Sequence, residues 1–252
     1  MANPFNFTGT KRRSIFVYKK LAIFIFLISV HFVSAQNTTK EALALQYIEQ
    51  KEYEKATLYL EELYDKNPGI WYSHYFNCLL KTKNFERAEK ITKKQIKNNK
   101  GDVTYYVQLG KVYNATNDKK KEEESYDKAL KEMNPYPPFL TGLVQAFIEI
   151  KDYNRAIEAY NKGRKATPDY PYYYERAEIY KMQGNIQAMV NEYLDAIEFR
   201  ESELYMAQNN LQNSLGYDDE NSGLKNPILK QELQKRIQAQ PDKTVFAEFL
   251  IF

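Results

Sequence analysis

Aromatic and alanine positions recur at a fixed interval in an otherwise charged stretch of the chain. The hexapeptides KEYEKA, KNFERA and KDYNRA end at Ala56, Ala88 and Ala156. Each carries Lys, an aromatic residue two positions later and Ala three positions beyond that. The intervals between the alanines are 32 residues (88 − 56) and 68 residues (156 − 88), and 68 is twice 34. A period of about 34 residues predicts an array of repeated helix pairs, with one diverged copy between the last two hexapeptides.

The diverged copy is the stretch YYVQLGKVYNATNDKKKEEESYDKALKEMNP. Leu109, Gly110 and Tyr113 open it, and Tyr126 and Ala129 close it. These residues resemble the tetratricopeptide repeat, in which a Leu-Gly pair and a Tyr lie on the first helix of a pair. Aromatic and Ala positions lie on the second helix of that repeat.

Three other units fit this frame over most of their key positions. The first has Ala44, Tyr47, Ala56, Leu60 and Pro68; the fourth has Phe147, Ala156, Tyr160, Gly163 and Pro168; the fifth has Ala177, Tyr180, Tyr193 and Ala196. The fifth departs from the family at Arg176 and Met189, where Leu and Ala are usual. The resemblance covers about residues 40–200.

The resemblance implies an all-α protein, a right-handed α-solenoid of stacked helix-turn-helix repeats. Small residues such as Ala44, Gly110 and Ala156 allow two antiparallel helices to approach closely. One pair cannot bury its apolar face alone, so successive copies stack. An ordinary helical bundle with a chance alanine pattern is the alternative. We expect three regions: residues 1–35, five repeats within residues 36–200, and further helices in residues 201–252.

The last region has a different pattern. ESELYMAQNNLQNSL and NPILKQELQKRIQAQ predict helices, and GYDDENSGLKNP between them predicts a loop. The end, DKTVFAEFLIF, looks like the first helix of an incomplete repeat. Its apolar residues Val245, Phe246, Phe249, Leu250, Ile251 and Phe252 suggest an amino-terminal fragment of a longer protein, because the end of a solenoid needs a polar outer face. A final helix that folds back onto the preceding one is the alternative.

The amino terminus has the layout of a secretory signal peptide. Five basic residues and no acidic one occupy the first 35 positions, and an apolar run follows from Leu21 to Val33. That run is shorter than the roughly 20 residues that a membrane-spanning helix needs. We predict cleavage between Ala35 and Gln36; an uncleaved anchor is the alternative.

Removal of the signal peptide changes the charge balance. Five of the 36 basic residues leave with it, so 31 remain against 33 acidic ones. A chain with no net positive charge offers no basis for nucleic-acid binding, which depends on neutralising phosphates. Cys78 is the only cysteine, so no internal disulfide can form.

The sequence offers little material for a catalytic or metal-binding motif. His74 is the only histidine beyond the signal peptide, and Cys78 lies four residues later on the same predicted helix face. No further ligand motif accompanies them, so we expect no metal site and interpret Cys78 as a core residue. Gly110 lacks the paired glycines of a nucleotide loop. We therefore expect no cofactor, no small-molecule substrate and no enzymatic activity.

Two surfaces are candidates for a polypeptide partner. In the tetratricopeptide family the first helices of successive repeats line the concave side, and the resemblance therefore points to Asn77, Lys81, Lys111, Asn114, Gln145, Glu149, Glu178 and Lys181. Such side chains can hydrogen-bond an extended peptide, or they simply form the solvated side of each helix. The second candidate is a patch of Tyr170, Tyr172, Tyr173 and Tyr174, which suits an interface or packing between repeats.

These observations leave two hypotheses. In the first, the chain is an exported, non-catalytic scaffold in the periplasm, envelope or surface of a Gram-negative-type bacterium. In the second, it is the exported sensory region of a larger membrane protein such as a sensor kinase. The partner and the oligomeric state are not encoded in any motif.

Overall fold

The computed structural model describes residues 40–216 and 226–251, and all structural statements below concern those residues. The predicted signal peptide and its cleavage site at Ala35 and Gln36 lie outside them. The chain divides into two compact units, residues 1–91 and 92–252, and each is described by itself.

The described part of the first unit consists of antiparallel helices. A helix over residues 40–49 precedes α2 (Tyr53–Lys66), α3 (Pro68–Lys81) and the beginning of α4 (Phe85–Asn98). Asn67 caps α3 by accepting a hydrogen bond from the backbone of Ile70, and Pro68 occupies the first turn, where its missing N–H costs nothing. Tyr64, Tyr72 and Tyr75 are buried at the contact between α2 and α3.

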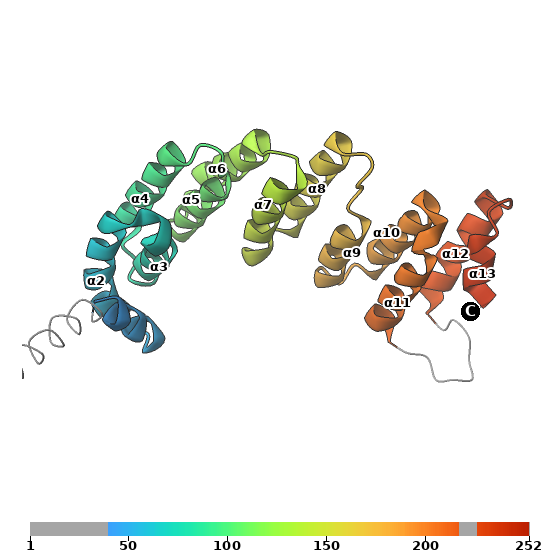
Figure 1. Cartoon of the computed structure of the whole chain (residues 1–252), viewed down its shortest axis with the longest axis horizontal. Coiled ribbons are helices and arrows are strands. Elements are labelled where there is room, and N and C mark those ends of the chain that lie inside the picture. Colours follow the sequence, from blue (N-terminus) through green and yellow to red (C-terminus); the bar gives the residue numbers. More distant parts are fainter. Residues whose placement is uncertain (1–39, 217–225, 252) are drawn as a thin grey trace, which may run out of the picture. The chain divides into compact units, whose positions relative to one another are not determined.

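The second unit contains three successive helix pairs, which Figure 1 shows in chain order. They are α5 (Thr104–Ala115) with α6 (Lys119–Glu132), α7 (Pro137–Glu149) with α8 (Tyr153–Ala166), and α9 (Tyr173–Met182) with α10 (Ile186–Phe199). No strand occurs in the described residues. The helical prediction and the repeated pairing are therefore confirmed.

Small residues are buried at the helix contacts, as the repeat pattern predicts. The alanines Ala44, Ala56, Ala88, Ala129, Ala156, Ala177 and Ala196 have almost no exposed surface. Gly110 on α5 approaches α6 so closely that an added Cβ would lie 2.1 Å from Cε1 of Tyr126. The spacing of small residues thus sets how near the helices of a pair can lie.

The turn within each pair has the same backbone geometry every time. Lys51, Lys83, Asn117, Lys151 and Gly184 all adopt positive φ. In each turn the following residue donates its N–H to a carbonyl five positions back, for example Asp152 to Phe147 and Asn185 to Tyr180. This is the left-handed ending that closes a helix and reverses the chain.

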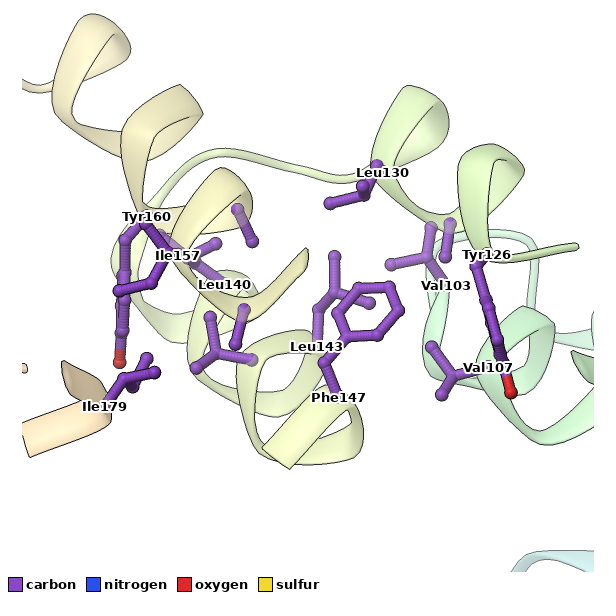
Figure 2. Close-up of a cluster of buried hydrophobic side chains, with 14 of the residues drawn as sticks. Val103, Val107, Tyr126, Leu130, Leu140, Leu143, Phe147, Ile157, Tyr160 and Ile179 are labelled. Carbon is purple, nitrogen blue, oxygen red and sulfur yellow. The ribbon is translucent and has the colours of Figure 1, made fainter. Parts of the chain in front are cut away.

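The core of the first two pairs in the second unit is continuous. Figure 2 shows Tyr126 and Val107 from one pair beside Phe147 and Leu143 from the next. The rings of Tyr126 and Phe147 meet edge to face with centroids 6.0 Å apart. Aromatic residues at the repeat positions are therefore core residues that join successive pairs.

Further helices follow α10 in the described residues. After η1 (Glu201–Glu203) come α11 (Leu204–Leu215), α12 (Pro227–Ala239) and α13 (Val245–Ile251). Val245, Phe246 and Phe249 of α13 are buried together with Leu229 and Leu233 of α12. This packing agrees with the alternative expectation, in which the final helix folds back onto the preceding one. That the chain is an amino-terminal fragment of a longer protein stays a prediction.

Candidate functional site

The first-helix residues of the second unit lie on α5, α7 and α9. Lys111 is half-buried, and Asn114, Gln145, Glu149, Glu178 and Lys181 are exposed. Asn77 and Lys81 are exposed on α3 of the other unit. Their role in binding stays a prediction.

Several first-helix residues already have partners inside the protein. Asn114 Nδ2 donates to Glu122 Oε1 at 2.7 Å. Glu178 accepts a hydrogen bond from the Tyr193 hydroxyl at 3.1 Å and lies 4.0 Å from the Lys181 ammonium. Gln145 and Glu149, both on α7, have no such partner within residues 40–216 and 226–251. The same holds for Asn77 and Lys81 on α3, so these four side chains are the ones of the set that are free to contact a partner.

A pocket lies where the tyrosine patch was predicted. Its lining consists of residues 169–175, of Ala196 and Phe199 at the end of α10, and of Arg200 and Glu203 just beyond that helix. We call this site the tyrosine pocket. It belongs entirely to the second unit.

Two arginines hold the loop that leads into α9. Arg164 Nε donates to the carbonyl oxygen of Pro171 at 2.8 Å, and its guanidinium lies 4.7 Å from the centre of the Tyr173 ring. Arg200 Nη2 donates to the carbonyl oxygen of Asp169 at 3.2 Å. The loop is therefore fixed at Asp169 and Pro171 by charge-assisted hydrogen bonds, which are stronger than neutral ones.

The four predicted tyrosines have different environments. Tyr172 is buried and stacks on Tyr160 with ring centroids 5.0 Å apart, so it serves packing between repeats. Tyr170 is 52% exposed, and Tyr173 and Tyr174 are half-buried. Tyr172 also has φ 57° and ψ 33°, a left-handed conformation that is costly for a bulky residue.

Carboxylates accept hydrogen bonds from the tyrosine hydroxyls at the pocket. The Tyr170 hydroxyl donates to Glu175 Oε1 at 2.6 Å, and the Tyr174 hydroxyl donates to Glu203 Oε2 at 2.9 Å. The hydrogen bond to Glu175, together with burial, raises the pKa of Tyr170 to about 12. Burial and then the bond to Glu203 raise the pKa of Tyr174 as well. Both tyrosines therefore remain neutral donors to anionic acceptors at physiological pH.

The sequence pattern pointed to the tyrosines of this pocket but not to the residues that line it from the end of α10 onward. Phe199, Arg200 and Glu203 follow the tyrosines by about 30 residues and belong to no motif. Phe199 is 43% exposed, although it ends a helix whose other apolar residues are mostly buried. They join the pocket only because α9 packs on α10.

Cys78 is a core residue, as expected, whereas His74 on the same helix is exposed. Cys78 is buried, and burial raises the pKa of its thiol to about 11, so the thiol stays protonated. His74 is exposed beside Trp71, with ring centroids 5.6 Å apart. Within the described ranges no group of His, Cys, Asp and Glu could hold a metal ion. Among the same residues, no helix combines the length and hydropathy needed to span a membrane.

Comparison with known proteins identifies the repeat. A model of the tetratricopeptide repeat family matches residues 103–132, which are α5 and α6 with the residue before them. No curated protein matches the chain.

Solved structures of similar fold include several tetratricopeptide repeat proteins. A thermophilic one from Thermus thermophilus is 16% identical with a TM-score of 0.37, covering 71% of this chain and 98% of that chain. One from Parabacteroides merdae is 16% identical with a TM-score of 0.34, covering 83% and 89%.

YrrB, described as having an unusual peptide-binding site, is 17% identical with a TM-score of 0.31, covering 75% and 96%. At such low identities and TM-scores, none of these likenesses bears on what this chain binds. The tetratricopeptide repeat model thus matches one helix pair of this chain, α5 with α6, and the same turn geometry recurs in the neighbouring pairs.

Proposed function

We propose that this protein is exported to the envelope of a Gram-negative-type bacterium and there binds a polypeptide partner through its first-helix residues, as a non-catalytic scaffold. The tetratricopeptide fold is that of a protein-interaction scaffold. The envelope location and the use of the first-helix residues for binding are our proposals.

The observation that carries the binding surface is the state of Gln145 and Glu149. Both are exposed on α7, and neither is engaged by another residue of the described chain. An amide offers two donors and an acceptor, and a carboxylate offers acceptors, so together they can satisfy the main chain of an extended peptide. A preformed helix presents them without the ordering cost that a mobile loop would add.

Export is supported by the amino-terminal sequence. A basic segment without acidic residues, a short apolar run and the small residues before Gln36 form the pattern that secretory proteins share. The net charge of the remaining chain, 31 basic against 33 acidic residues, is compatible with a protein partner of either sign.

Crosslinking in the native envelope tests the binding surface. The wild type is compared with a Gln145→Ala/Glu149→Ala variant and with the control Lys131→Ala/Lys165→Ala, which changes exposed residues on the second helices α6 and α8. We expect the α7 variant to lose a crosslinked partner that both other proteins retain. An identical set of crosslinked partners for all three proteins would remove the assignment of Gln145 and Glu149.

Mass spectrometry of the protein recovered from the envelope tests export separately. The expected amino-terminal residue is Gln36. Recovery of the uncleaved chain in the cytosol alone would contradict the proposed location and leave the binding test unaffected.

A further inference from the structure

We propose that the tyrosine pocket binds the basic side chain, arginine or lysine, of a polypeptide partner. The inference rests on the proposed function only in taking the occupant to be part of a polypeptide. It concerns residues other than Gln145 and Glu149, so the two can succeed or fail independently.

The charge of the pocket favours a cation. The lining includes three acidic residues, Asp169, Glu175 and Glu203, and one basic residue, Arg200. A second basic residue, Arg164, contacts the lining at Pro171 and Tyr173. None of the three carboxylates forms an ion pair with another described residue. Each carboxylate has about four acceptor sites, so Glu175 and Glu203 can take further donors besides one tyrosine hydroxyl each.

The walls of the pocket are aromatic. Tyr170, Tyr173 and Phe199 contribute rings, and those of Tyr173 and Phe199 have centroids 5.9 Å apart at 58°. The face of an aromatic ring attracts a cation held within about 6 Å of its centroid. Arg164 already lies 4.7 Å from the centre of the Tyr173 ring. Tyr170 and Phe199 are therefore the rings that remain for a further guanidinium or ammonium beside these carboxylates.

The pocket has the size of a side chain and not of a cofactor. Its volume is about 90 Å³, whereas pockets for small molecules usually have about 300–1,000 Å³. Tyr172, in its left-handed conformation, lies between Tyr170 and Tyr173 and is held by its stack on Tyr160. Strain of this kind persists only where the surroundings enforce it and is concentrated at binding sites.

Arg200 shows how a cation can be accommodated here. Its guanidinium carbon lies 5.0 Å from the centre of the Phe199 ring, while one nitrogen donates to the carbonyl of Asp169. Arg200 is exposed and can leave this ring for solvent. An incoming basic side chain therefore competes with Arg200 for Phe199.

The test uses a peptide that differs from its control only in charge. The probe is acetyl-Gly-Ser-Arg-Ser-Gly-amide, and the control contains citrulline, which has nearly the same shape as arginine but no charge. Each is titrated into the purified protein labelled in its Phe and Tyr rings, and binding is followed by NMR shifts. We expect the arginine peptide to shift the signals of Phe199 and Tyr173, less so as salt is added, and the citrulline peptide to leave them in place.

Matched variants separate the pocket from general effects. Phe199→Leu and Glu203→Gln should each weaken arginine-peptide binding about two- to fivefold, as expected for the loss of one cation–π contact or one carboxylate. Phe139→Leu and Glu201→Gln make the same substitutions at exposed residues outside the pocket and should have no effect.

Three outcomes would overturn the proposal: equal binding of both peptides, unchanged binding to Phe199→Leu, or shifts confined to residues outside the pocket. The first-helix variant Gln145→Ala/Glu149→Ala should bind the arginine peptide as the wild type does. If this variant binds the arginine peptide but loses no crosslinked partner, the proposed function is wrong and the proposal for the tyrosine pocket is unaffected.

Discussion

Arg176 on α9 donates to the Glu192 carboxylate on α10 at 2.8 Å, and only 9% and 7% of these two side chains are exposed. Arg164 lies 3.1 Å from the same carboxylate. Burial nevertheless raises the pKa of Glu192, against the opposing effect of both arginines. Arg176 Nε and Nη1 are buried and have no hydrogen-bond partner. Desolvation therefore outweighs pairing at this site.

The neighbouring repeats suggest a replacement for this ion pair. Leu143 and Ala159 occupy the equivalent positions one repeat earlier, 33 residues before each member of the pair. We expect Arg176→Leu/Glu192→Ala to be neutral or to stabilise the protein by about 1–4 kcal/mol, because it removes two buried charges together. Urea unfolding measures the change.

The single variant Arg176→Leu is the control for that prediction. It leaves the buried Glu192 with Arg164 alone, so we expect a loss of up to about 3 kcal/mol. If the double variant is less stable than the single one, the ion pair stabilises the repeat and our interpretation is wrong.

Gly110 is required by the close contact of α5 and α6. In Gly110→Ala the new methyl group would lie 2.1 Å from Tyr126 Cε1, so the helices must separate or the ring must move. We expect the free energy of unfolding to fall by about 1–3 kcal/mol.

Gly142, which is exposed within α7, provides the matched control. An added Cβ there would have only Thr104 Cγ2 nearby, at 3.7 Å. Gly142→Ala should therefore stabilise the protein by about 0.5–1 kcal/mol, as expected for removal of a helix-interior glycine. A gain of stability in both variants would mean that helix propensity and not the contact decides.

Lys151 adopts the left-handed conformation in the turn of the fourth repeat, with φ 61°. Glycine reaches this region without the steric cost that other residues incur. Lys151→Gly should raise the free energy of unfolding by up to about 1 kcal/mol, measured by the urea midpoint.

Gly184 is the equivalent residue of the fifth repeat, and the structure has no atom within 4 Å of an added Cβ there. Gly184→Ala therefore isolates the backbone cost and should destabilise by about 1 kcal/mol. Equal stability of Gly184→Ala and wild type would show that the turn relaxes.

Glu62 on α2 pairs with Lys40 on the preceding helix. The stability that Glu62 adds should therefore fall at acidic pH. Hydrogen bonds from Lys40 and Lys66, at 2.7 and 2.8 Å, lower the pKa of its carboxyl to about 2. A depressed pKa adds stability above the ordinary value of about 4.3, and this stability is lost as the pH falls toward the folded value. The stability difference between wild type and Glu62→Gln should therefore shrink between about pH 5 and pH 2.

Two controls accompany the pH experiment. Glu49→Gln changes an exposed carboxylate for which the described chain has no ion-pair partner, and it should show no comparable trend. High salt should reduce the effect of Glu62, because its partners are exposed and are screened. A pH-independent difference between wild type and Glu62→Gln would contradict the assigned cause.

The sequence by itself determined the repeat and its core. Ala56, Ala88 and Ala156 recur because each helix contact needs a small residue at the same place, and this requirement is local enough to be visible in spacing. Tyr126 and Tyr160 are likewise core residues at repeat positions. Pro68 and Pro137 lie in the first turns of α3 and α7, where proline is favoured by local sequence alone.

Only the tertiary structure decided which side chains share a site. Arg176 departs from the family pattern, but its pairing with Glu192 follows from packing of α9 on α10. Of the predicted tyrosines, Tyr172 is buried, while Tyr170 and Tyr173 join Phe199 and Arg200 in one pocket. The physical reason is that local spacing fixes helices and their apolar faces, whereas burial, pairing and pockets depend on which helices come together.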